Sequence, residues 1–187
     1  MRYVSIDIET TGLNPETCQI FEFAAIVDDT KKSNTVPRQS FQCFVVPEDG
    51  IIRGEAQGLM MNGQILERIA VRRSEDRFTF PRYLTQKFRQ FLLESGFDNE
   101  KITVAGKNFA GFDLPFLRLC PGWSETIRIH SRTIDPGSLY FDPLRDTVVP
   151  DTKECANRAG LTYNGNHEAL GDAAQIIQIL RAKWGLL

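Results

Sequence analysis

The sequence predicts an α/β fold in which a mixed sheet of five strands, the first three antiparallel, is flanked by helices. Two observations lead to this prediction. Residues 3–9, 19–27 and 40–46 are strand-like and follow one another without an intervening helix, which is typical of an antiparallel meander. Beyond residue 80, helical and strand-like segments alternate, as they do where helices cross over an α/β sheet.

Composition places the chain among ordinary globular proteins. Its 187 residues suffice for a sizeable core, and we expect a single domain over residues 1–187. Hydrophobic residues make up 42% and charged residues 25%, which argues against a disordered or fibrous chain. The formal net charge of −2 gives no global basic field, so a nucleic-acid partner would be held by local basic residues and bound metal ions.

The cysteines and the start of the chain bear on its environment. Because no two cysteines form a C-x-x-C pair, we expect buried free thiols and no structural zinc site. The first strand begins at once, without the apolar segment of a signal peptide, and no apolar run has the length of a membrane span. We therefore expect a cytoplasmic protein with no membrane partner.

The first strand alternates polar and apolar residues, so that Asp7 and Glu9 share one face while Val4, Ile6 and Ile8 share the other. This pattern predicts a half-buried strand. Two carboxylates in this arrangement lie within reach of one divalent cation and would repel each other without it. A solvated strand face is the usual explanation of an isolated Asp-x-Glu pair, so partners elsewhere in the chain must decide.

The next elements follow from periodicity and turn residues. Residues 19–27 are largely apolar on both faces and predict a buried strand, whereas residues 28–39 are polar and predict a loop. The third strand ends at Pro47. Residues 54–70 have the pattern of two short helices, separated at residues 62–63.

The second half of the chain begins with a strong helix signal. From Pro81, apolar residues recur at helical spacing up to Gly96, and a short buried strand follows at 102–106. Asp113 is a natural N-cap for a short helix. For the remainder we expect an irregular stretch at 121–131, a loop at 142–151, a helix at 152–158, and a last helix from about Glu168 to Trp184 with Asp172 in its first turns.

Three segments of the chain resemble, in order, the three exonuclease motifs of the DEDD superfamily, in the subclass with a histidine (DEDDh) that includes proofreading subunits and ribonuclease T. Residues 7–12 read Asp-Ile-Glu-Thr-Thr-Gly, residues 108–113 read Asn-Phe-Ala-Gly-Phe-Asp, and residues 167–172 read His-Glu-Ala-Leu-Gly-Asp. The resemblance implies a ribonuclease H-like fold, with a short strand at 133–135. Lys107 departs from it, because many relatives carry a histidine there.

The resemblance also implies a site. Asp7, Glu9, Asp113 and Asp172 would hold two ions, Mg²⁺ or Mn²⁺, and His167 would act as the general base. Such a site suits phosphodiester hydrolysis, in which two hard cations activate water and neutralise developing charge. An imidazole with an ordinary pKa of ~6.5 can accept the proton of that water near neutral pH.

Contacts to the terminal nucleotide are expected, by the same resemblance, from residues near the motifs. A methionine in an apolar helix is more often core filler than a substrate contact. Four arginines between residues 68 and 77 are interrupted by acids, which is more typical of a solvated loop than of a phosphate-binding track. The candidate contacts are Thr11, Leu13, Met61, Asn62, Asn108 and Phe109.

The implied activity is that of a metal-dependent 3′→5′ exonuclease that releases nucleoside 5′-monophosphates from single-stranded ends, with DNA favoured over RNA. An exoribonuclease is the alternative, because nothing in the sequence selects for or against a ribose 2′-hydroxyl. A non-catalytic nucleic-acid-binding domain on the same fold is a second alternative. A polymerase or another replication or repair protein is a candidate partner.

Overall fold

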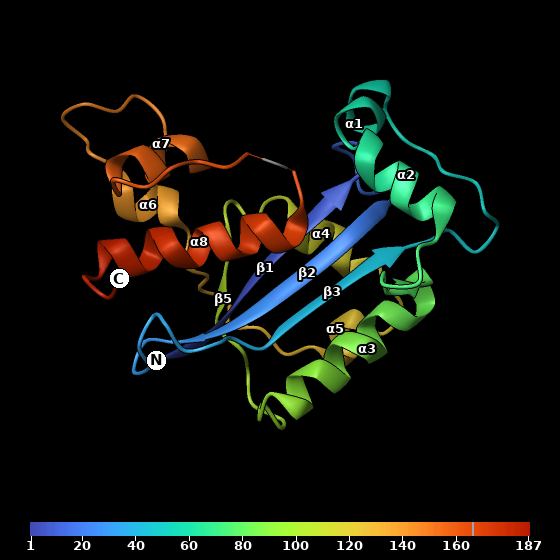
Figure 1. The fold of residues 1–187 in the computed structure, drawn as a ribbon, viewed down its shortest axis with the longest axis horizontal. Coiled ribbons are helices and arrows are strands. Elements are labelled where there is room, and N and C mark those ends of the chain that lie inside the picture. The colour runs from blue at the N-terminus through green and yellow to red at the C-terminus, as the bar shows by residue number, and fades with distance from the viewer. Residues whose placement is uncertain (166) are drawn as a thin grey trace.

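The computed structural model, which describes residues 1–165 and 167–187, contains a mixed five-stranded sheet of order β4-β3-β2-β1-β5 (Figure 1). The first three strands are antiparallel, and a short parallel strand joins each edge. This confirms the predicted mixed sheet with its antiparallel meander. The strands are β1 (Arg2–Thr10), β2 (Ile20–Asp29), β3 (Ser40–Val45), β4 (Phe78–Thr79) and β5 (Val104–Ala105).

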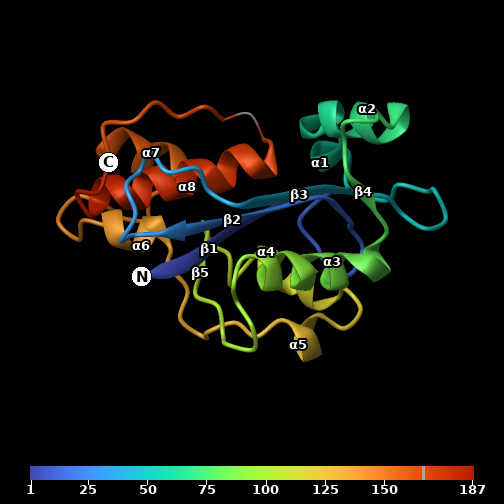
Figure 2. The same ribbon diagram turned by 60° about the horizontal axis from the view of Figure 1, so that its bottom comes forward.

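Helices cover both faces of the sheet. Figure 2 shows α3 and α5 on one side of the sheet and α1, α2, α7 and α8 on the other. The order of layers is thus helix, sheet, helix, as an α/β fold requires. The helices are α1 (Ala56–Met61), α2 (Gly63–Val71), α3 (Pro81–Glu94), α4 (Asp113–Arg118), α5 (Trp123–Thr126), α6 (Pro136–Tyr140), α7 (Thr152–Arg158) and α8 (Ala169–Lys183).

Several short elements differ from the sequence prediction. The edge strand β4 was not predicted, since two residues are too few to show a period of two. Residues 133–135, expected as a strand, contribute only a single parallel bridge from Ile134 to Ala105. The strand expected at 102–106 is reduced to β5. The stretch 121–131, expected to be irregular, contains the one-turn helix α5, whose Trp123 is buried in the core.

Both faces of β1 are covered, which corrects the prediction of a half-buried strand. Val4, Ile6 and Ile8 belong to the larger hydrophobic cluster, together with α3. On the other face, the Ser5 hydroxyl donates a hydrogen bond to the carbonyl of Ala173 in α8, at 2.8 Å. The apolar stripe of α8 lies over this face, so the helix fixes what can approach the polar side of β1.

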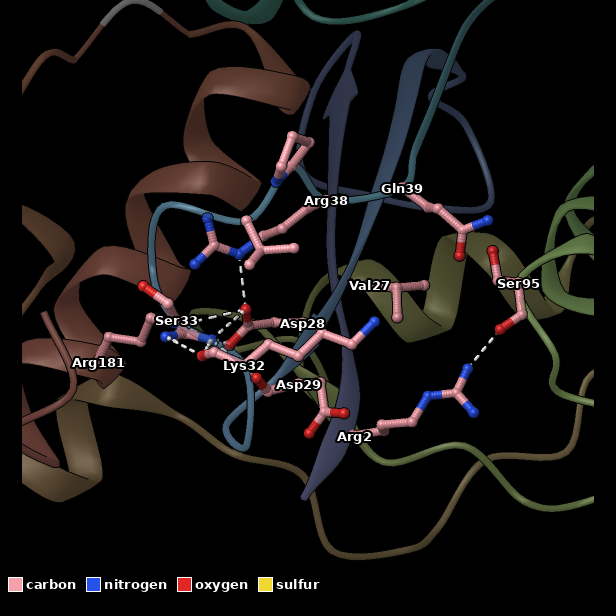
Figure 3. Close-up of a pocket in the computed structure, with 12 residues that line it drawn as sticks. Arg2, Val27, Asp28, Asp29, Lys32, Ser33, Arg38, Gln39, Ser95 and Arg181 are labelled. Carbon is pink, nitrogen blue, oxygen red and sulfur yellow. Dashed lines mark hydrogen bonds and ion pairs between the residues drawn. The ribbon is translucent and has the colours of Figure 1, made fainter.

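The C-terminal half of α8 is attached to β2 by a buried ion pair (Figure 3). Asp28 is almost fully buried and accepts hydrogen bonds from Arg181 at 2.9 Å and from Arg38 at 2.6 Å. These two guanidinium groups hold the pKa of Asp28 below its ordinary value, although burial by itself would raise it. The pair fixes the helix along the sheet.

Two further expectations concern the thiols and the membrane. Cys18, Cys43, Cys120 and Cys155 are buried and free, as predicted. Among the helices of the described residues, none combines the length and the apolar character that crossing a bilayer demands.

Candidate active site

The first two motif acids lie on the face of β1 that α8 covers. Asp7 and Glu9 are half-buried, and Glu9 is paired across the sheet with Glu22 of β2. The regular pairing of β1 with β2 ends directly after Glu9, where the register shifts before Thr10. The two carboxylates therefore sit at the end of the ladder, where the N-terminus of α8 begins.

Asp113 reaches the same strand from a helix. It is buried, and its Oδ1 accepts a hydrogen bond from the backbone N–H of Ile8 at 3.2 Å. The prediction that Asp113 is the N-cap of its helix is wrong, because Phe112 occupies the cap position and Asp113 is the first helical residue. The carboxylate is thus directed to β1, between the positions of Asp7 and Glu9, and not to its own helix.

The third motif supplies the other side of the site. Asp172 lies in the first turn of α8, and His167 precedes that helix with a positive φ of 48°. One potential ligand atom from each of Glu9, His167 and Asp172 lies within 4.8 Å of the other two. Residues 158 positions or more apart in the chain are therefore brought together by the packing of α8 on β1.

Burial and the crowding of carboxyl groups at this place raise their pKa values. Burial raises the pKa of Asp7 well above its ordinary value, and the charges of Asp113, Glu9 and Asp172 raise it further. Burial and the neighbouring acids raise the pKa of Glu9 to about 8. Burial also raises the pKa of Asp113, and that of Asp172 despite the opposing effect of His167.

The donor set suits a hard divalent cation. Within residues 1–165 and 167–187, no lysine or arginine forms an ion pair with any of the four motif acids. Carboxylates held together without such a partner repel one another, and a cation with a preference for oxygen relieves that repulsion. The acids of the three motifs therefore fit Mg²⁺ or Mn²⁺.

Glu22 is a buried acid beside the site that sequence reasoning missed. Its Oε2 accepts a hydrogen bond from the backbone N–H of Ala169 at 3.2 Å, and its Oε1 accepts one from the Gln42 side chain at 2.5 Å. Burial raises its pKa. The available signal was that Glu22 is the single charged residue between positions 20 and 27 of an otherwise apolar strand.

The candidate nucleotide contacts fall into two groups. Leu13 and Met61 are exposed, with 73% and 53% of their surfaces accessible, and they are free to meet a ligand. Asn62 is buried and donates a hydrogen bond to the carbonyl of Thr10 at 3.0 Å. A hollow of about 400 Å³ lies between α2 and the start of α8, lined by Met60, Met61, Asn62, Gln64, Arg68, His167 and Glu168 among others.

The remaining candidates are largely committed to the fold. Thr11 is fully buried, and its hydroxyl donates to the carbonyl of Arg53 and accepts from the N–H of Gln19, both at 2.7 Å. Phe109 is buried in the core and offers no face to a stacking base, which corrects that part of the expectation. Asn108 is exposed, and of these three it alone presents its side chain to solvent.

Asp135 supports the turn at Asn108, where the motif of residues 108–113 begins. Asp135 accepts hydrogen bonds from the backbone N–H groups of Asn108 at 2.8 Å and of Gly137 at 2.7 Å. Asn108 has a positive φ of 53°, a conformation that an L-residue adopts only with support. Lys107 lies 3.6 Å from Asp135, so the residue that departs from the motif is part of this turn.

Comparison of sequences finds no match, either to a protein-family model or to a curated protein. The architecture does match a known class: the mixed sheet with flanking helices is similar to a ribonuclease H-like exonuclease fold. One solved structure that shares it is that of E. coli Exonuclease I in complex with a dT13 oligonucleotide. The TM-score is 0.66 at 17% sequence identity, over 98% of this chain and 40% of that chain. The chain thus spans less than half the length of that protein.

Proposed function

We propose that this chain is a DEDDh exonuclease that hydrolyses phosphodiester bonds at the 3′ ends of single-stranded nucleic acid and releases nucleoside 5′-monophosphates. The observation that carries the proposal is the convergence of three sequence motifs at one end of β1. Asp7 and Glu9, Asp113, and His167 with Asp172 come from distant parts of the chain and share one negatively charged site.

The acids would hold two divalent cations. Asp7, Glu9, Asp113 and Asp172 offer enough oxygens for a pair of ions without filling their coordination shells, which leaves room for water and a phosphate. When bound, such ions supply the positive charge that neutralises the phosphoryl oxygens and the leaving 3′-oxygen. The chain's own contribution is to hold these carboxylates together despite their repulsion.

His167 would act as the general base. Its imidazole lies within reach of Glu9 and Asp172, at the rim of the site where the attacking water would stand. The imidazole accepts the proton of that water as the new bond to phosphorus forms. His130, the other histidine, has no motif around it, so it provides an internal control.

Single-stranded DNA is the favoured substrate. The bound oligonucleotide in the Exonuclease I complex supports it by analogy of fold. The exposed side chains of Leu13 and Met61 flank the site and could contact the last bases, which are reached at least cost when unpaired.

Degradation assays test the proposal. DNA and RNA strands, single and double, labelled at either the 5′ or the 3′ end, are incubated with Mg²⁺, and a closed circular strand is included. We expect 5′-labelled linear DNA to shorten stepwise from its 3′ end, with mononucleotide as the product. Cleavage of the circle would contradict an exonuclease, and faster decay of RNA would replace DNA by RNA as the substrate.

A further inference from the structure

Glu22 is buried, and a buried carboxylate lowers the stability of a fold unless its lost hydration is replaced. None of its surface is exposed, and it points from the sheet toward the start of α8. Burying a carboxylate is unfavourable unless hydrogen bonds compensate for the lost water. The partners of Glu22 therefore indicate what the fold gains from it.

Through one of these partners, Glu22 of β2 caps the N-terminus of α8. Ala169, whose N–H bonds to Oε2, is the first residue of α8. The first N–H groups of a helix have no partner within it, and a side chain at the N-cap usually accepts from one of them. In α8 the N-cap is Glu168, which forms no such bond, and Glu22 satisfies Ala169 from the sheet instead.

This bond links the two halves of the proposed site. Glu9, on β1, is held opposite Glu22 by the strand register, while His167 and Asp172 lie two residues before and three residues after Ala169. A carboxylate at a helix N-terminus also interacts favourably with the helix dipole. One side chain thus connects the strand that carries the first motif to the helix that carries the third.

We propose that Glu22 is a positioning residue, which fixes the N-terminus of α8, and with it His167 and Asp172, relative to Glu9. The inference rests on the proposed function as far as catalysis is concerned. Each oxygen of Glu22 accepts a hydrogen bond from the protein and none of its surface is exposed, so the proposal places Glu22 beside the metal ligands and not among them.

Three variants separate this role from a general loss of stability. Glu22→Leu removes the acceptor at similar volume, and Glu22→Gln keeps an acceptor for Ala169. Tyr140→Phe is the matched control, because it removes a hydrogen bond to α8 at Ile179, about two turns beyond Asp172. A misplacement of about 1 Å caused by a mutation outside the reacting centre can cost on the order of 10²-fold in rate. We expect a loss of up to that size in kcat for Glu22→Leu, with KM for a single-stranded oligonucleotide nearly unchanged, and wild-type kcat for Tyr140→Phe.

The conservative variant gives a readout that a merely structural role would not move. Glu22→Gln should recover most of kcat, whereas equal loss in the Gln and Leu variants would overturn the proposal, as would wild-type kcat in Glu22→Leu. If Glu22→Leu does not fold, Ala169→Pro removes the donor instead, at a first helical position where proline is tolerated. It should lower kcat to a similar extent, and unchanged kcat would again overturn the proposal.

Amide hydrogen exchange distinguishes this inference from the proposed function, because it needs no activity. Glu22→Leu should speed exchange in the first turn of α8 without affecting the turn that contains Arg181, and Glu22→Gln should not. If the wild type degraded no nucleic acid but this exchange pattern appeared, the function would be wrong and the positioning of α8 right. Unchanged exchange in Glu22→Leu would reject the positioning itself.

Discussion

The two ends of α8 are each bound to strand β2 through a buried carboxylate, and the two carboxylates have opposite surroundings. At the C-terminal end, Asp28 lies between two guanidinium groups, and its pKa is lowered. At the N-terminal end, the two donors that the described part of the chain offers to Glu22 are uncharged, and burial raises its pKa. The charge of Asp28 is thus neutralised by its hydrogen-bond partners, whereas that of Glu22 is not.

The two ends differ in what their charge can do. At Asp28, two guanidinium groups neutralise the carboxylate, so the ion pairs hold the helix in place and leave no charge to bind a ligand. At the other end, the charge of Glu22 adds to the repulsion between Asp7 and Glu9, so several carboxyl groups stay crowded together there. A proton or a cation that prefers oxygen ligands would relieve that repulsion.

The largest effect should follow from removing the cations or an acid that would hold them. Chelation should abolish hydrolysis, and Asp7→Asn should lower kcat by at least the ~10²–10³-fold that loss of a single charge-stabilising group costs. Because the substitution relieves repulsion, the metal-free variant should melt no lower than the wild type. Glu16→Gln, at an exposed position, is the control. Full activity in chelator would refute the proposal that the motif acids hold catalytic cations.

The proton acceptor should have the next largest effect. His167→Ala should reduce kcat by ~10²–10⁴-fold, the usual contribution of a general base, while Mn²⁺ binding by titration calorimetry stays nearly unchanged. His130→Ala should behave as the wild type. The reverse result, with His130 essential and His167 dispensable, would exclude the third motif.

A substitution at the Asp28 end of α8 should lower the stability of the protein without changing its metal affinity. Arg181→Met leaves Asp28 with Arg38 alone, and breaking a buried ion pair from one side costs about 3–5 kcal/mol. Urea unfolding should record this loss, while the folded variant keeps its metal affinity. If the loss were as small as that of an exposed pair, the distinction between the two ends would disappear.

The smallest effect is a dependence of stability on pH that differs between the ends. The pKa of Glu9 is raised to about 8 from an ordinary 4.5, so its stabilising contribution is present below pH 4.5 and is lost as the pH rises through about 8. The pKa of Asp28 is lowered, so its contribution is present above its ordinary pKa and is lost as the pH falls. In chelator, the free energy of unfolding should therefore decline between about pH 4.5 and 8.

A substitution and a ligand test the origin of this decline. Glu9→Gln should make the decline in chelator shallower but not remove it, because one group that loses its proton is gone while the pKa values of the other crowded acids stay raised. Mg²⁺ should reverse the decline in the wild type and do so less in the variant. An unchanged profile in Glu9→Gln would assign the decline to other groups.

The long elements and the three motifs could be predicted from the sequence, because periodicity and short motifs are local properties. The meander and the amphipathic helices α3 and α8 follow from such patterns, and the mixed sheet confirms them. Roles that depend on distant partners could not be predicted. Glu22 accepts from a residue 147 positions away, and the direction of Asp113 depends on a free N–H in β1.

Burial decided the errors among the candidate contacts. Phe109 belongs to a motif, but its ring is buried in the main hydrophobic cluster. Leu13 and Met61 remain candidates because they are exposed. The roles of all the site residues stay predictions until the variants are measured.

The shortness of β5 has a consequence for anyone who would rebuild this site in another scaffold. Val4 of β1 donates its N–H to the carbonyl of Thr103, but β5 ends at Ala105, three positions before the residue that would pair with Ile8 in the same register. The N–H of Ile8 is therefore left for Asp113. A designer who lengthened β5 for stability would pair the N–H of Ile8 with the new strand and leave Asp113 without its donor. A scaffold that receives this site therefore needs an edge strand that ends before Ile8.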